Sequence, residues 1–135
     1  LRKLRRSLAR RRAIAARYDA ALSEIPGIRP LKVSSEVSHA YHLYVVRVDP
    51  SRLGMDREMA FRLLREWGIG VNVHYIPVHL HPYYRTRLGT RPGMCPIAEA
   101  AYERILSLPM YPAIADADVE RVVGALRRLA QTRVP

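Results

Sequence analysis

The sequence predicts a small α/β domain of the α+β type, in which a mostly antiparallel sheet carries helices on one face. Segments with helical periodicity alternate with short segments rich in β-branched and aromatic residues, in the order α, β, α, β, α, β, α. The chain has 135 residues, of which 49% are apolar, and this composition suffices for the core of one domain. No run of about 18 apolar residues occurs, so the sequence predicts no transmembrane helix.

Residues 1 to about 23 form the first predicted helix. Its apolar positions recur at spacings of three and four or their sums, which places them on one stripe: Leu1, Leu4, Leu8, Ala15, Tyr18 and Leu22. Arg11 and Arg12 interrupt this stripe. We therefore expect a long helix that its own domain covers only in part, with one end leaning on something else. Pro26 and Gly27 then end the helix.

The next segments are a possible short strand at 28–33, a loop, and a strand at 41–48 that is apolar on both faces and ends at Asp49-Pro50. We expect this second strand to be central in the sheet. A helix follows at 57–67, with Asp56 capping its first turn and Gly68 in the left-handed conformation at its end. Its apolar stripe is Met59, Leu63 and Trp67.

Residues 69–76 alternate between apolar and more polar side chains, which predicts a half-buried strand with His74 on its polar face. A Pro-rich loop and a helical turn over PYYRTRL come next. Pro96 is suited to the first position of another helix, and LSLPMYP predicts an edge strand because prolines interrupt it. Asp116 is expected to cap the last helix, whose apolar face is regular.

The net charge of +11 belongs to the two ends of the chain. Residues 1–17 hold eight Lys/Arg and no acid, residues 18–119 hold eleven of each sign, and residues 120–135 hold four Arg against one Glu. The excess charge is therefore a property of two terminal helices. Such a helix face is usually solvated or paired with acidic residues on another domain. Phosphate binding is the alternative, but no recognised nucleic-acid motif accompanies the charge.

The start of the chain and its single cysteine indicate the cellular compartment and the extent of the protein. The basic start is not followed by the apolar segment of a signal peptide, and Cys95, as the single cysteine, cannot form an intramolecular disulfide. Both features favour the reducing cytoplasm. The chain begins at Leu1, without an initiator Met and already in helical pattern, and we expect it to be a piece of a longer protein.

The stretch Trp67–Arg85 gathers polar aromatic side chains on one Pro-rich loop, which suggests a binding surface. His74, His79 and His81 could supply imidazoles to a metal ion, but no HExxH-like helix accompanies them. His74 or His79 could act as a general base, but no Ser or Cys nucleophile with an Asp partner is indicated beside them. The third interpretation is structural, with His74 hydrogen-bonded on its strand and the other two solvated.

A family resemblance favours the interpretation of Trp67–Arg85 as a substrate-binding surface. The sequence resembles the C-terminal region of the DegT/DnrJ/EryC1/StrS family of pyridoxal-phosphate-dependent sugar aminotransferases, from about Arg11 to Leu126. The segments that carry the resemblance are RRAIAARYDAAL, AYHLYVVRV, the helix ending WGIG, VHYIPVHLHPYYR, PIAEAAYERILSLPMYP and DADVERVVGAL. Within the family it is most similar to the PseC-like enzymes, which aminate C4 of UDP-4-keto-6-deoxy-N-acetylhexosamines.

The resemblance implies a fold type I aminotransferase, in which a large domain binds the cofactor and a small C-terminal domain closes over the substrate cleft. Residues 1–25 would be the long helix connecting the two, and residues 26–135 the small C-terminal domain. In such enzymes a lysine of the large domain forms the Schiff base with pyridoxal 5′-phosphate. Lys3 and Lys32, the only lysines here, occupy no matching position. We expect this segment alone to be inactive and not to bind the cofactor.

The resemblance also implies a nucleotide-sugar acceptor, an amino donor such as glutamate, and a homodimer when the protein is full-length. The pathway would be surface-polysaccharide or glycan sugar biosynthesis. Expected to line the nucleotide-sugar side of the cleft are His74, Tyr75, His79, Tyr83 and Arg85. No catalytic residue, cofactor-binding residue or metal ligand is expected in this segment. The alternatives are a stand-alone basic nucleic-acid-binding module and a dimerising remnant without catalysis.

Overall fold

The structure, a computed structural model, describes residues 2–132. Its centre is a three-stranded antiparallel sheet in the spatial order β1 (Ile28–Pro30), β2 (Tyr44–Val48), β3 (Ile105–Leu108). β2 is the central strand, as its apolar composition predicted. β3 lies at an edge of the sheet and ends before Pro109, as the prolines of LSLPMYP predicted. Alternate strand residues form one buried face: Ile28, Tyr44, Val46, Val48, Leu106 and Leu108.

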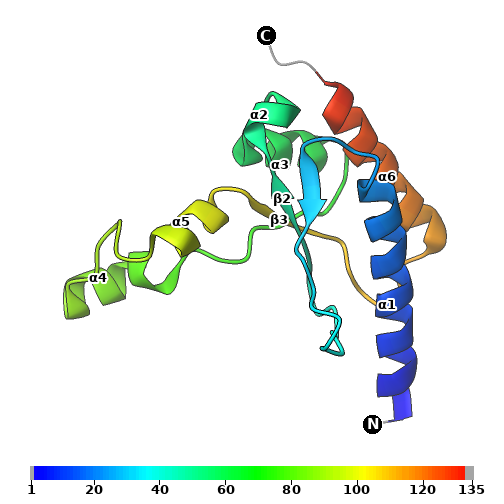
Figure 1. The fold of residues 1–135 in the computed structure, drawn as a ribbon, viewed down its shortest axis with the longest axis horizontal. Helices are drawn as coiled ribbons and strands as arrows, with labels where there is room; N and C mark the ends of the chain where they lie inside the picture. The colour runs from blue at the N-terminus through cyan, green and yellow to red at the C-terminus, as the bar shows by residue number, and fades with distance from the viewer. Residues whose placement is uncertain (1, 133–135) are drawn as a thin grey trace.

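Three helices pack against the sheet and one another. α1 (Arg2–Leu22) and α6 (Asp116–Gln131) lie side by side, and α3 (Arg57–Glu66) contacts both α6 and β3 (Figure 1). Buried side chains from these helices join the sheet in one core, among them Ile14, Tyr18, Leu64, Val119, Val122 and Leu126. The predicted small, mostly antiparallel sheet with helices packed on one face is confirmed.

The signals predicted at the two ends of α3 are confirmed, but the buried side of the helix differs from the predicted stripe. The carboxylate of Asp56 accepts a hydrogen bond from the Met59 backbone N–H at 2.8 Å, and Gly68 has a φ of 76°. The buried side of α3, however, is centred on Ala60 and Leu64. The predicted stripe of Met59, Leu63 and Trp67 is only half-buried, because it flanks the side that meets the core.

The predicted strand at 69–76 is wrong. Within it only Asn72 pairs with the sheet, in an isolated antiparallel bridge to Ser107. Ile69 and Val71 are buried, but the chain leaves the sheet after Asn72. The alternating pattern therefore belongs to an extended segment that crosses the sheet without pairing along it. A short helix that the sequence did not predict, α2 (Pro50–Leu53), follows β2.

Arg11 and Arg12, which interrupt the apolar stripe of α1, hold the helix to other segments of the chain by polar contacts. The Arg11 guanidinium donates to the carbonyls of Tyr41 and Met110 at 2.8 and 3.1 Å, and Arg12 donates to the Ser38 hydroxyl. The exposed part of α1 is its first turns, where Leu4 is 51% exposed; Leu1 lies outside the described residues. These turns extend beyond the start of α6 (Figure 1).

Asp116 does not cap the last helix. Ala115 occupies the N-cap position of α6 and makes no side-chain cap. The Asp116 carboxylate instead binds the guanidinium groups of Arg10 and Arg17 at 2.6 and 2.7 Å, so its charge joins α6 to α1. Arg17 also pairs with Glu120 at 2.6 Å. Part of the basic face of α1 is therefore paired with acidic residues.

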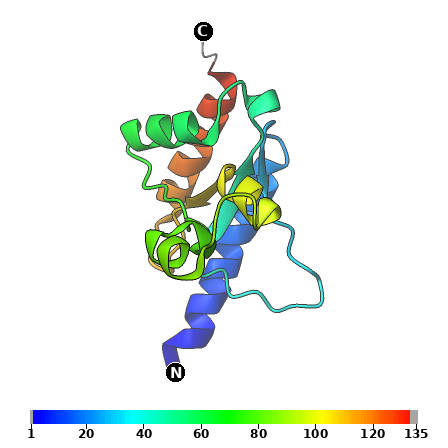
Figure 2. The ribbon, with the colours of Figure 1, turned by 90° about the vertical axis from the view of Figure 1, so that its left-hand side faces the viewer.

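Residues 74–102 form a projecting segment, here called the arm. It contains a 3-10 turn, η1 (Val78–Leu80), and two short helices, α4 (Pro82–Leu88) and α5 (Pro96–Tyr102). The arm extends away from the helices and sheet in Figure 1, and α4 and α5 stand in front of the sheet in Figure 2. None of its three helical turns contains a buried residue. Across residues 2–132, no helix combines the length and apolar character needed to cross a bilayer.

Candidate functional site

The arm is held together by hydrogen bonds around Glu99. One carboxylate oxygen of Glu99 lies 2.8 Å from Nε2 of His79 and 3.2 Å from the backbone N–H of Cys95. The backbone N–H of Gly93 is 2.9 Å from each of the two oxygens. The Gly93 N–H and the His79 ring hold the pKa of the Glu99 carboxyl below its usual range. This junction joins η1, the loop before α5 and α5 itself.

The base of the arm is fixed to the sheet through His74. Its Nδ1 lies 2.8 Å from the hydroxyl of Ser107, which is the one buried polar side chain of the described core. Ser107 also exchanges two backbone hydrogen bonds with Asn72. The His74 ring meets the Tyr75 ring edge to face at 4.6 Å. With Nδ1 engaged, Nε2 is the ring nitrogen that His74 can offer to a ligand.

The other predicted site residues lie on the outer surface of the arm. Tyr75 is 72% exposed and Tyr83 is 68% exposed, and Arg85 is exposed as well. Tyr83 packs only edge to face with Tyr84, at 5.4 Å. The structure therefore brings His74, Tyr75, His79, Tyr83 and Arg85 onto one arm, but two of them, His74 and His79, also have structural partners.

The three histidines of the arm do not converge. His74 contacts Ser107, His79 contacts Glu99, and the Nε2 of His81 lies 3.2 Å from the carbonyl oxygen of Ile76. In residues 2–132 no group of three or more His, Cys, Asp or Glu side chains is arranged to hold a metal ion. Their hydrogen bonds make these histidines parts of the arm's framework.

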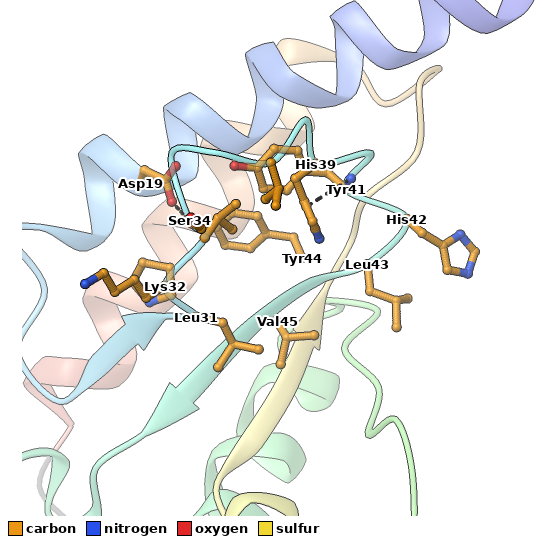
Figure 3. A pocket seen from close by; sticks show the side chains of 13 residues that line it. Asp19, Leu31, Lys32, Ser34, His39, Tyr41, His42, Leu43, Tyr44 and Val45 are labelled. Atoms are coloured by element: carbon orange, nitrogen blue, oxygen red, sulfur yellow. Dashed lines mark hydrogen bonds between the residues drawn. The ribbon is translucent and has the colours of Figure 1, made fainter.

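A second feature, which the sequence did not predict, is a cavity of about 670 Å³ beside α1. The loop from Pro30 to Leu43 surrounds it together with β2 and the end of α1 (Figure 3). Side chains that line it include Asp19, Leu31, Lys32, His39, Tyr41 and Tyr44. Apart from Asp19, the lining residues all lie between Pro30 and Val45. No recognised motif marks this stretch, and the run of aromatic residues in SHAYHLY was the one available signal.

Tyr44 and Asp19 form the polar floor of this cavity. The Tyr44 hydroxyl donates to the Asp19 carboxylate at 2.6 Å, and the Tyr44 ring lies 4.9 Å from the ring of Tyr18. Burial and the bond to Asp19 raise the pKa of Tyr44 above the ordinary tyrosine value, and burial raises that of Tyr18. Both phenols therefore stay neutral donors at physiological pH.

The rim of the cavity is held by Arg11. Tyr41 has a φ of 47°, an unusual conformation for a bulky residue, and the Arg11 guanidinium binds its carbonyl and that of His42. The His39 ring packs edge to face on Tyr41 at 4.5 Å. The His42 side chain points away from this group in Figure 3.

The comparisons with known proteins concern almost the whole chain. Residues 1–127 match the DegT/DnrJ/EryC1/StrS aminotransferase family. The spore coat polysaccharide biosynthesis protein SpsC of Bacillus subtilis is 44% identical over 123 residues, which are 90% of this chain and 32% of SpsC. The chain spans about a third of the length of the curated relatives it matches.

Solved structures agree with this match. Spr1654 of Streptococcus pneumoniae, a proposed sugar aminotransferase, has been solved in PLP and PMP forms. The PLP form is 29% identical, has a TM-score of 0.84, and the alignment covers 96% of this chain and 32% of that one.

Helicobacter pylori PseC, an aminotransferase of pseudaminic acid biosynthesis, is 22% identical with a TM-score of 0.84, over 96% of this chain and 34% of that one. At 22% identity the likeness to PseC shows the fold alone, and it does not establish PseC-type specificity. Family membership rests on the match over residues 1–127. The chain belongs to the DegT/DnrJ/EryC1/StrS aminotransferase family.

Proposed function

We propose that this chain is the C-terminal part of a pyridoxal-phosphate-dependent sugar aminotransferase. Residues 1–25 would connect the two domains, and residues 26–135 would form the small domain that closes the substrate cleft. The observation that carries the proposal is the family match over residues 1–127. The likeness to Spr1654 in its PLP form, over 96% of the chain, supports the same function.

The acceptor that we propose is a nucleotide-linked keto sugar, specifically a UDP-4-keto-6-deoxy-N-acetylhexosamine aminated at C4, with glutamate as the amino donor. The polysaccharide pathway named for SpsC supports a sugar acceptor. We further propose that the complete protein is a cytoplasmic homodimer. The single cysteine of this chain is consistent with a reducing compartment.

The arm supplies the side chains that this acceptor needs. The exposed rings of Tyr75 and Tyr83 can stack on a sugar or a base, and the Arg85 guanidinium can pair with a diphosphate. His74 can donate a hydrogen bond from Nε2 because Ser107 engages its other ring nitrogen. In this proposal the arm recognises and orients the acceptor, and the reactive groups come from the large domain.

The described residues do not fit pyridoxal 5′-phosphate itself. Lys3 and Lys32, the only lysines of the chain, are both exposed. Lys32 lines the cavity beside α1, but the Asp19 carboxylate lines it as well and disfavours a phosphate dianion. The lining also includes no arginine. The cofactor would therefore be held by the large domain.

An activity measurement on the longer protein tests the proposal. Glutamate is expected to change the visible absorbance of the bound cofactor, and the keto sugar is expected to restore it while a 4-amino sugar forms, detected by mass spectrometry. Absence of amino transfer to any nucleotide-linked keto sugar would overturn the function. The 135-residue chain alone, mixed with pyridoxal 5′-phosphate, should give only the spectrum of the free cofactor.

A nucleic-acid-binding module is less well supported. Arg10, Arg11 and Arg17 of α1 are engaged by carboxylates or backbone carbonyls of the same chain. An oligonucleotide-binding measurement at several salt concentrations separates the two functions, because phosphate contacts produce a steep decrease of affinity with salt. We expect no such binding at physiological salt.

A further inference from the structure

We propose that Glu99 is a positioning residue that sets the geometry of the arm for the sugar acceptor, which rests on the proposed function above. Glu99 does this by binding the His79 ring and the loop that contains Gly93 and Cys95 at the same time.

The geometry of the junction shows why one carboxylate can control the arm. The Glu99 side chain is 20% exposed and the His79 side chain 11% exposed, so both are largely shielded from water by arm residues. Glu99 lies on α5, His79 lies in η1, and Gly93 lies in the loop between α4 and α5. The hydroxyl of Thr90 adds a bond to the carbonyl of His79 at 2.7 Å. Glu99 and Thr90 therefore both hold the 3-10 turn η1, Glu99 through the His79 ring and Thr90 through the His79 carbonyl.

The arm has no apolar core that could replace this junction. Most of its large apolar side chains face solvent, namely Tyr75, Ile76, Val78, Tyr83, Tyr84, Leu88, Met94 and Ile97. An element without buried apolar contacts depends on its hydrogen bonds for local order. Removing the Glu99 charge weakens several of these bonds together, and hydrogen bonds to a charged acceptor are the stronger kind.

A capping role alone would not require this arrangement. A side chain that only caps α5 would need the Cys95 N–H, because Cys95 is the N-cap residue of that helix. Glu99 also reaches the His79 ring, which comes from a different element and which the family resemblance implies as a substrate contact. The extra bond fixes the orientation of the imidazole and thus connects α5 to the predicted binding surface.

The test compares Glu99→Gln with Glu103→Gln in the complete aminotransferase. Both changes remove one charge from the same part of the chain, and Glu103 is exposed. For Glu99→Gln we expect the KM for the keto sugar to increase about tenfold, because misplaced contacts lose binding energy. The half-reaction with glutamate should change less than about twofold, since it does not use the arm. Glu103→Gln should leave both unchanged.

Amide hydrogen exchange on the 135-residue chain gives an independent measurement. The Gly93 and Cys95 amides should exchange faster in Glu99→Gln, while the amides of β2 keep their rates. Unchanged exchange at Gly93 and Cys95 would overturn the junction, whatever the enzyme does. Faster exchange with an unchanged KM would overturn the positioning role. If the complete protein transfers no amino group, the proposed function fails, and the exchange result still decides whether Glu99 orders the arm.

Discussion

At the scale of single residues, Tyr18 and Tyr44 are the side chains whose ionisation the fold changes most. Tyr18 donates to the Pro109 carbonyl at 2.9 Å, and Tyr44 donates to Asp19. Burial raises the pKa of both phenols. A raised pKa in the folded state contributes stability below the unfolded value, about 10, and this contribution decreases as the pH rises above it.

We therefore expect two of the eight tyrosines to ionise only when the chain unfolds in alkali. Ultraviolet absorbance of phenolate, followed together with circular dichroism, measures this. Tyr44→Phe should remove one late-ionising group. Ionisation of all eight tyrosines before any loss of secondary structure would contradict the buried hydrogen bonds.

The hydroxyl of Ser107 is the second single group whose removal should change stability measurably. Ser107→Ala removes the hydroxyl that contacts His74 and should lower the free energy of unfolding by about 0.5–1.5 kcal/mol, as for a typical buried hydrogen bond. Denaturant unfolding measures the change. Ser23→Ala is the matched control, because its hydroxyl is exposed and binds only the nearby Ala20 carbonyl. Equal effects of the two changes would show that the Ser107 hydroxyl has no special role.

At the scale of elements, Asp116 adds an ion-pair contribution to the apolar packing of α1 against α6. The Arg10 bond, with Arg17 nearby, holds the pKa of Asp116 below its usual range. A lowered pKa in the folded state gives stability that is present above the unfolded pKa and lost as the pH falls through the folded pKa. Asp116→Asn should therefore lower the melting temperature at neutral pH, and this difference should disappear in acid.

Asp118→Asn is the control for this pair of helices. Asp118 lies in the same first turn of α6, and its nearest partner, Arg121, is 3.8 Å away within the helix. High salt should reduce the effect of Asp116→Asn, because the Asp116 side chain is 63% exposed and its charge is screened. If Asp118→Asn destabilised the chain as much as Asp116→Asn, the bridge between the helices would not be the cause.

The elements also show what the sequence can and cannot predict. The central position of β2 and the capping of α3 by Asp56 were predictable because composition and local hydrogen bonding determine them. The Asp116 cap was not, because two arginines of a distant helix compete for its carboxylate. The strand predicted at 69–76 failed because pairing is a tertiary property, and only Asn72 finds a partner.

The candidate site also has features that the sequence could predict and features that it could not. That Tyr75, Tyr83 and Arg85 share one segment was readable from the order of the residues. The partners of His74 and His79 are 33 and 20 residues away, so sequence spacing could not predict them. The cavity beside α1 joins Asp19 to Tyr44 and was missed for the same reason. The roles of the five predicted substrate contacts stay predictions.

At the scale of the whole molecule, we distinguish the arm from the body, which is the sheet together with α1, α3 and α6. We expect the body to supply nearly all of the free energy of unfolding. No residue from 74 to 104 belongs to the described buried core. Replacing residues 75–103 by a short Gly/Ser turn should keep the sheet and the α1–α6 pairing. We expect the melting temperature to change by only a few degrees, about the effect of 1 kcal/mol in a domain of this size. Circular dichroism and amide exchange of β2 measure the outcome.

Loss of cooperative unfolding in this variant would show that the arm is needed for the fold of the body. The control is a variant that keeps the arm and replaces Leu64, which is fully buried in α3, by Ala. That change should cost about 2–5 kcal/mol, because it leaves a cavity in the core. The core substitution should therefore be far more damaging than the removal of the arm.

The Asn72–Ser107 bridge brings the two ends of the arm together at a single point of the sheet. An insertion whose entry and exit are neighbours can change length and sequence without disturbing the packing of its host. We therefore expect the arm to tolerate changes of length and sequence without loss of the core fold. Under the proposed function, in which the arm contacts the acceptor, grafting the arm of a relative onto this chain should transfer the acceptor preference of that relative while the core sequence stays constant.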